Sequence, residues 1–153
     1  MKEQLEALLA FHRALQVYTS EQPTADLPPE VRELRIRLIQ EELNEYAAAA
    51  RAGDLVGVAD ALTDLLYVVL GAMLAHGLHP IAEALFAEVH RSNMSKVGAD
   101  GKPVLRDDGK VLKPPHFSPP DLERILAPWL PRDAQPSTAH RAGPISHSAG
   151  GNA

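Results

Sequence analysis

The feature that most constrains the fold of this chain is a helix with three carboxylates along one edge. Residues 32–46 have the pattern of an α-helix. Successive residues of such a helix advance by about 100°, so Glu41, Glu42 and Glu45 fall within an arc of about 100°. A row of acids this dense predicts either a solvated face or a site that binds cations.

A second acidic segment follows directly. Residues 58–69 also predict a helix, in which Asp60 and Asp64 are four residues apart and therefore share one face. Between the two helices, Gly53 suits the C-terminal cap of the first and Asp54 suits the N-cap of the second. We therefore expect the two helices to fold back on each other through a very short turn.

The two rows of acids are expected to come level in this hairpin. At about 1.5 Å per residue, Glu45 and Glu42 lie roughly 12 and 16 Å from the turn, and Asp60 and Asp64 lie roughly 9 and 15 Å from it. Carboxylates gathered in this way raise one another's pKa and lose hydration, which is unfavourable without positive charge. Oxygen ligands select hard cations, so the sequence predicts Mg²⁺ or Mn²⁺, with Ca²⁺ as a third candidate. The candidate ligands are Glu41, Glu42, Glu45, Asp60 and Asp64.

The second helix is apolar on almost all sides from residue 55 to residue 74, which predicts a buried central helix. Carboxylates are seldom fully buried unless they are paired or bind a metal. Two aspartates in such a helix therefore favour the metal site over a solvated acidic face. Because a single hairpin cannot cover this helix, we expect a bundle that is completed by oligomerisation.

Composition limits the classes of partner and compartment. The chain has 153 residues, enough for one domain, and a formal net charge of −5, which argues against general nucleic-acid binding. It has no cysteine, which excludes disulfides and thiolate metal sites. The acidic start does not fit a signal peptide, and the longest apolar run, residues 65–75, is too short to span a bilayer. We expect a cytoplasmic protein without a membrane partner.

The other helical patterns predict an all-α bundle of four to five helices around the carboxylate hairpin. An amphipathic helix is expected over about residues 2–19, followed by a proline-rich loop over residues 20–29. His12 on its apolar face is expected to be packed or partly exposed and not to serve as a metal ligand. A further helix is expected over roughly residues 80–95. Its buried side chains are predicted to be Ile81, Leu85 and Val89.

That helix ends in a polar group formed by Arg91, Asn93 and Lys96. Cations near a helix C-terminus are favoured by the helix dipole, so a simple charged cap explains them as well as a binding role does. A small basic β-hairpin flap is predicted over residues 101–115, because two β-prone runs flank the turn signal Asp108-Gly109. Lysines of the flap suit either phosphate binding or protection of an exposed strand.

The C-terminal part is predicted to contain one short helix and a tail. Ser118 is expected to cap a helix that ends near Leu126, with Trp129 as an anchor. The folded domain is thus expected over residues 1–130. Residues 131–153 contain too few apolar side chains to fold and predict a disordered tail.

Taken together, these residues resemble the all-α nucleoside triphosphate pyrophosphohydrolases of the MazG and phosphoribosyl-ATP pyrophosphohydrolase type. The family signature is Glu-Glu-x-x-Glu on one helix and Glu-x-x-Asp on the next. Glu41, Glu42 and Glu45 match the first part fully; Asp64 matches the aspartate of the second part, whereas Ala61 stands in place of its glutamate. The segment from residue 89 to Lys96, with the basic flap, is most similar to the branch of MazG-like dUTP pyrophosphatases. The resemblance covers roughly residues 5–120.

The resemblance implies hydrolysis of a nucleoside triphosphate, for example the deoxynucleotide dUTP, to the monophosphate and pyrophosphate. Glu42, Glu45 and Asp64 would hold Mg²⁺, with Asp60 as a further or outer-sphere ligand and Glu41 as a ligand or the general base. The substrate would be bound by Arg91, Asn93, Lys96 and Lys113. Gln16, with Phe11, His12 or Leu15, is a candidate for the base pocket. A homodimer or homotetramer would complete the bundle, and the sites would then be built from two chains.

Two other functions are compatible with a carboxylate-rich helical bundle. A di-iron carboxylate bundle would need Glu-x-x-His motifs, which do not occur in this chain. A non-catalytic nucleotide- and metal-binding regulatory module is harder to exclude, because Ala61 replaces an expected ligand. Metal-dependent turnover separates the two functions.

Overall fold

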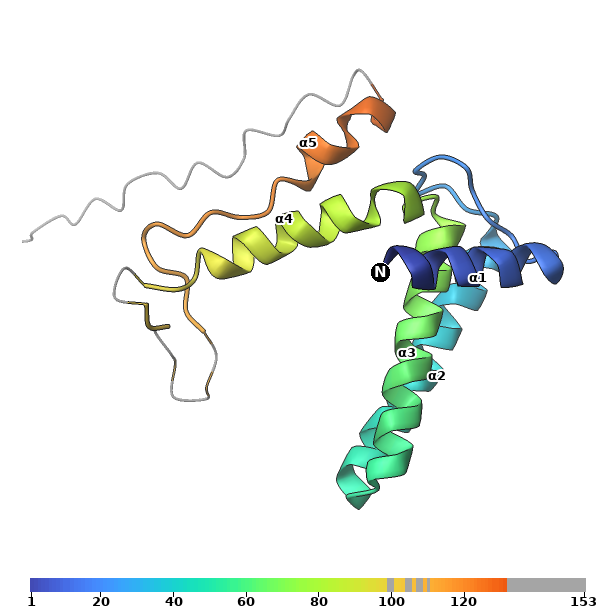
Figure 1. The fold of residues 1–153 in the computed structure, drawn as a ribbon, viewed down its shortest axis with the longest axis horizontal. Helices are drawn as coiled ribbons and strands as arrows, with labels where there is room; N and C mark the ends of the chain where they lie inside the picture. Colours follow the sequence, from blue (N-terminus) through green and yellow to red (C-terminus); the bar gives the residue numbers. More distant parts are fainter. Residues whose placement is uncertain (99–100, 104–105, 107–108, 110, 132–153) are drawn as a thin grey trace, which may run out of the picture.

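The computed structural model describes residues 1–98, 101–103, 106, 109 and 111–131. The described part is all-α: its regular elements are helices, and the nearest approach to a sheet is one isolated bridge between Val97 and Pro103. The elements in order are α1 (Lys2–Ala14), α2 (Pro29–Ala52), α3 (Leu55–Ala75), the 3₁₀ turn η1 (His79–Ile81), α4 (Ala82–Met94), α5 (Leu122–Leu126) and the 3₁₀ turn η2 (Ala127–Trp129). Figure 1 shows their arrangement.

Helices α2 and α3 form the antiparallel hairpin that the sequence predicts (Figure 1). Pro29 occupies the first position of α2, where its missing amide proton costs nothing. Gly53 ends the helix in the left-handed conformation, at φ 70°. Asp54 then caps α3, because its carboxylate accepts a hydrogen bond from the amide of Val56 at 3.1 Å. Because the last cap residue of α2 and the first cap residue of α3 are neighbours in the chain, the turn is as short as expected.

Helix α1 crosses the end of α3 that lies away from this turn (Figure 1). The small apolar core gathers there, where α1, α3 and the start of α4 meet, and it consists of Leu5, Leu8, Leu70, Leu74 and Ala82. His12 is buried beside it, as its place on the apolar face predicts. The helix ends at Ala14, earlier than the expected residue 19, and Gln16 takes a positive φ of 55° directly after it.

Helix α3 is not buried in the single chain, which corrects the prediction of a buried central helix. Only Ala61, Leu70, Gly71, Leu74 and Ala75 are buried, and both aspartates are exposed. One neighbouring helix along its length and one across its end leave most of the apolar circumference uncovered. By length and composition alone α3 is also capable of crossing a membrane, a test that core helices of soluble proteins pass as well. Two aspartates within the helix would be costly in a bilayer.

Helix α4 begins after a 3₁₀ turn and buries a different face from the predicted one. Ile81 and Leu85 are half-buried and Val89 is exposed, whereas Ala82, Glu88 and Ser92 are buried. The reason is that α4 runs away from the hairpin (Figure 1) and packs against the segment before α5 instead of an apolar core.

The C-terminal segment also departs from the prediction. Asp121, and not Ser118, caps α5, and its carboxylate accepts from the amide of Arg124 at 3.0 Å. Ser118 is used elsewhere, by the side chains of α4. Trp129 lies in η2 and lines a cavity of about 600 Å³ together with Leu78 and Leu126. The turn residue Asp108 of the predicted flap and residues 132–153 of the predicted tail lie outside the described residues, so the flap and the tail stay predictions.

Candidate functional site

Two close approaches set the register of α2 against α3. A Cβ on Gly57 would lie 3.1 Å from Cβ of Ala49, and a Cβ on Gly71 would lie 3.0 Å from Nη1 of Arg35. Seven residues make nearly two helical turns, so positions seven apart share a face. Counting seven inward from each contact leads to residue 42 on α2 and residue 64 on α3. Glu42 and Asp64 therefore lie level, facing each other across the hairpin.

Glu42 is the most constrained acid of this group. It is half-buried, and its Oε2 atom is shielded from solvent without a hydrogen-bond partner in the described structure. Burial raises the pKa of the Glu42 carboxyl, and the negative charges of Glu45, Asp64, Glu41 and Asp60 raise it further. The other four acids predicted from the sequence thus all act on the carboxyl group of Glu42, which is an electrostatic condition that favours binding of a cation.

The other acids surround Glu42 but do not form a finished coordination sphere. Among the described residues, no three Asp, Glu or His side chains stand close enough to share one metal ion. The carboxylates of Glu45, Asp60 and Asp64 are exposed and have no hydrogen bond or ion pair to other described side chains, so rotation could bring them inward. Glu41 lies 3.9 Å from Arg37, in an exposed ion pair along the same helix. The donor set fits a hard divalent cation, with Glu42 as its fixed member.

Ala61 is buried at the point where the related signature has a glutamate. The register that pairs residue 42 with residue 64 also pairs residue 45 with residue 61, so Ala61 lies opposite Glu45. The small side chain leaves the layer around Glu45 one carboxylate short. Asp60, one residue earlier, is the nearest acid on α3 that could compensate.

The predicted phosphate ligands Asn93, Lys96 and Lys113 are brought together around Phe117. Lys96 Nζ donates to Oδ1 of Asn93 at 2.7 Å and lies 6.0 Å from the centre of the Phe117 ring. Lys113 Nζ lies 4.8 Å from the same ring centre. The end of α4 and the segment before α5 therefore form one basic surface, which we call the lysine cluster (Asn93, Lys96, Lys113 and Phe117).

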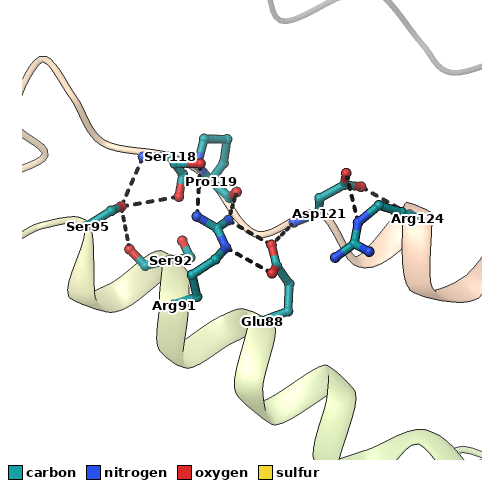
Figure 2. A network of polar contacts seen from close by, with 8 residues as sticks. All are labelled: Glu88, Arg91, Ser92, Ser95, Ser118, Pro119, Asp121 and Arg124. Atoms are coloured by element: carbon teal, nitrogen blue, oxygen red, sulfur yellow. Dashed lines mark hydrogen bonds and ion pairs between the residues drawn. The ribbon is translucent and has the colours of Figure 1, made fainter.

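Arg91 has a different environment from these residues. Its guanidinium forms a bidentate pair with the buried carboxylate of Glu88, at 2.9 and 2.7 Å, and donates to Ser118 Oγ and to the carbonyl oxygen of Pro119. Figure 2 shows this network, in which the amide of Asp121 also donates to Glu88. The hydrogen bonds from Arg91 hold the pKa of Glu88 down at about 2. Arg91 and Glu88 thus attach residues 118–121 to α4 through hydrogen bonds. The substrate-binding role of Arg91 stays a prediction.

The remaining candidate, Gln16, follows the end of α1, and two functional candidates that sequence reasoning did not indicate are Arg35 of α2 and Glu88 of α4. Gln16 is exposed just beyond the end of α1, and its role in base binding stays a prediction. Arg35 is 7% exposed and its Nε has no partner among the described residues, which sequence reasoning did not foresee. Glu88 was also missed. A signal existed for Glu88, since Arg91 follows it at the spacing of a helical ion pair.

Comparison with known proteins identifies the family. The family model described as phosphoribosyl-ATP pyrophosphohydrolase matches residues 8–93, which is more than half of the chain and spans both acidic helices. The chain belongs to this family. A comparison with curated proteins found no match. Membership supports the suspected relationship to all-α nucleoside triphosphate pyrophosphohydrolases and indicates a hydrolase that acts on a nucleotide triphosphate. The matched region contains all five acids but ends before Lys96 and the predicted flap.

Proposed function

We propose that this protein hydrolyses a nucleoside triphosphate, such as the deoxynucleotide dUTP, to the monophosphate and pyrophosphate with Mg²⁺ or Mn²⁺. The observation that carries the proposal is the Glu42 carboxylate, which faces Asp64 and keeps one shielded oxygen without a partner. A half-buried carboxylate beside four other acids is unfavourable without a nearby positive charge. Removal of unwanted nucleotides from the cytoplasmic pool is the role that fits such an activity.

The residues divide into three tasks. Glu42, Glu45 and Asp64 would hold the metal, Asp60 would assist as a further or outer-sphere ligand, and Glu41 would serve as a ligand or as the general base. When bound, Mg²⁺ would offset phosphate charge and lower the pKa of a coordinated water. Glu41 is suited to accept the proton of that water, because it is exposed at the edge of the acid group and paired only through one weak contact with Arg37.

The lysine cluster would bind phosphate oxygens, but from a neighbouring chain. Helix α4 runs away from the hairpin, so its C-terminal end does not lie along α2 and α3 of the same chain (Figure 1). At the same time α3 exposes large apolar side chains, including Leu62, Leu66 and Val69. A homodimer or homotetramer would cover this surface and bring the cluster of one chain to the acids of another.

The second candidate function is a nucleotide- and metal-binding regulatory module without turnover. The observation that favours it is the buried Ala61, which removes a carboxylate from the layer of Glu45. Such a module would bind nucleotide and metal through the same groups but leave the substrate intact.

A panel of nucleoside triphosphates with Mg²⁺ and Mn²⁺ separates the two functions. We expect release of pyrophosphate, not orthophosphate, and loss of at least about a hundredfold in rate for Glu42→Gln, which keeps the shape but removes the charge. Glu33→Gln, on the exposed part of α2, is the matched control and should keep the wild-type rate. Binding of nucleotide and metal without any turnover would establish the regulatory module instead.

A further inference from the structure

Three nitrogen atoms outside the acid group are shielded from solvent without a hydrogen-bond partner in the described structure, and they belong to His12, Arg35 and the half-buried His79. Only the first two belong to buried side chains. His12 of α1 is 3% exposed and Arg35 of α2 is 7% exposed. Nδ1 of His12 and Nε of Arg35 are shielded from solvent and have no partner in the described structure. The proposed hydrolysis uses neither atom, so their arrangement needs another explanation.

The two side chains converge over Gly71 of α3. The place that a Cβ on Gly71 would take lies 3.0 Å from Nη1 of Arg35 and 3.5 Å from Nε2 of His12. A Cβ at this position would be tight against the guanidinium of Arg35 and in ordinary contact with the imidazole of His12. Three helices thus contribute to one small polar floor, made of Arg35, His12 and the bare backbone at Gly71.

This floor lies in line with the acid group. Arg35 precedes Glu42 by seven residues on α2, and Gly71 follows Asp64 by seven on α3, so the floor is about 10.5 Å from the acids along both helices. Tyr67 lies between the two levels and meets Phe11 of α1 edge to face, at 6.0 Å between ring centres. Both rings are nearly half exposed. These two rings, which we call the aromatic wall (Phe11 and Tyr67), therefore lie beside the floor, with the ring centre of Phe11 6.3 Å from that of His12.

An unpaired buried guanidinium costs much more free energy than a paired one. Arg35 has no acceptor among the described residues, and the two acids that precede and follow it on α2, Glu33 and Glu41, are bonded to Arg32 and near Arg37. A ligand that pairs with Arg35 must therefore supply the hydrogen-bond acceptors. An aromatic wall beside the floor indicates a flat, partly apolar ligand group.

We propose that Arg35 and His12 read the base of the nucleotide and select bases with a lactam edge, an N–H beside a C=O, as in uracil, thymine and guanine. This inference rests on the proposed function, because it places the triphosphate at the acids and the base one heptad away. It assigns Arg35, which no sequence motif indicated, as the residue that determines base specificity.

The donor and acceptor pattern of the floor decides the class of base. Arginine only donates, so it suits the carbonyl oxygen. Burial and the nearby charge of Arg35 lower the pKa of His12, which keeps the imidazole neutral with one accepting nitrogen for the N–H of the base. Cytosine and adenine present the reverse pattern, with an amino group that would face the arginine. A site built to pair a polar edge rejects a mismatched one strongly.

Binding of non-hydrolysable nucleotides tests this inference without relying on turnover. The full chain is titrated with α,β-imido dUTP and α,β-imido dCTP in Mg²⁺ by calorimetry. We expect at least a tenfold preference for the uracil analogue, and Arg35→Met should reduce the preference by about tenfold or more while changing affinity for the cytosine analogue little. His12→Gln should act in the same direction. Arg32→Met, an exposed arginine one turn away, is the control and should keep the preference.

The outcomes separate the two proposals. If neither analogue binds with metal present, the proposed function fails and this inference fails with it. If both bind equally, or if Arg35→Met and Arg35→Lys both keep the preference, the inference is overturned and the proposed function stands. A carboxylate from a second copy would be the true partner of Arg35 if the variants change the oligomeric state but not the preference. Circular dichroism confirms that each variant is folded, and Arg35→Lys provides a milder change should Arg35→Met fail to fold.

Discussion

At the scale of single residues, the acid group depends on where each carboxylate sits and not only on how many there are. Glu42 is fixed and shielded, whereas Glu45 and Asp64 are exposed and free to turn. Ala61 is buried opposite Glu45, so this layer has one carboxylate fewer than the related signature provides. Adding that carboxylate should alter stability and metal affinity in opposite directions.

Ala61→Glu tests this expectation. Without metal, another acid beside Glu42 and Glu45 adds repulsion and desolvation, and we expect the melting temperature to fall by about 2–4 °C. With saturating Mg²⁺ the extra ligand should restore or exceed the wild-type value, because binding to the folded state alone stabilises it. Scanning calorimetry with EDTA and with Mg²⁺ measures both effects. Ala61→Gln adds the same volume without charge, and it should show no added gain from Mg²⁺.

The sequence predicted that the acids of the two helices come level, because both charge and helical spacing can be read from the chain. The sequence could not predict the burial of Arg35, because an arginine on a charged helix is ordinarily solvated. Its burial depends on how the helices pack against one another. The close approach of the Arg35 guanidinium to the backbone at Gly71 also has no signal in the sequence. A glycine within an apolar helix is compatible with many kinds of close packing.

At the scale of elements, the helix ends at the α2–α3 turn, which depend on neighbouring residues, were predicted correctly, and the start of α5, which depends on a distant contact, was not. The α2–α3 hairpin was predicted well, since Gly53 and Asp54 act through their own backbone and neighbouring amides. The prediction for the start of α5 was wrong, because Ser118 is bonded to Arg91 of α4 and to Ser95 directly after that helix. That choice depends on a tertiary contact 23 to 27 residues away in the chain, which local cap preferences do not contain.

The Glu88–Arg91 pair should make attachment of the C-terminal segment sensitive to acid. The folded pKa of Glu88 is about 2, below the usual 4.5. The pair therefore stabilises the fold fully above about pH 4.5, and the contribution is lost as pH falls towards about 2. We expect Glu88→Gln to weaken attachment at pH 7, and the difference from wild type to shrink below pH 4.5.

Fluorescence of Trp129 measures this attachment, because it is the only tryptophan of the chain and lies just after α5. Urea titrations at several pH values give the midpoint for each variant. Glu123→Gln replaces an exposed acid of the same segment and serves as the control. A constant difference between wild type and Glu88→Gln from pH 7 to pH 2.5 would contradict the role of the pair.

At the scale of the whole molecule, the main unexplained feature is the exposed apolar surface of α3. Leu55 and Val56 are each 80% exposed at the turn, and Leu66 is 55% exposed in the middle of the helix. Contiguous apolar surface of this extent is typical of an interface. The same arrangement separates the lysine cluster from the acids within one chain, so association would supply both cover and substrate ligands.

Complementation between two inactive variants tests whether the site is shared. Glu42→Gln lacks an acid and Asn93→Ala lacks part of the lysine cluster, so each homodimer should be inactive. If a site takes its acids from one chain and its cluster from the other, a mixed dimer carries one site with both defects and one intact site. Random mixing makes half of the dimers mixed, so the activity should recover to about a quarter of wild type.

A site contained in a single chain gives the opposite result, because every chain in the mixture carries one defect and activity stays near zero. The variants must exchange subunits, which is achieved by unfolding and refolding them together. Mixing without refolding is the control and should recover activity only at the rate of subunit exchange. Recovery near a quarter therefore requires that the lysine cluster of one chain and Glu42 of another form one site.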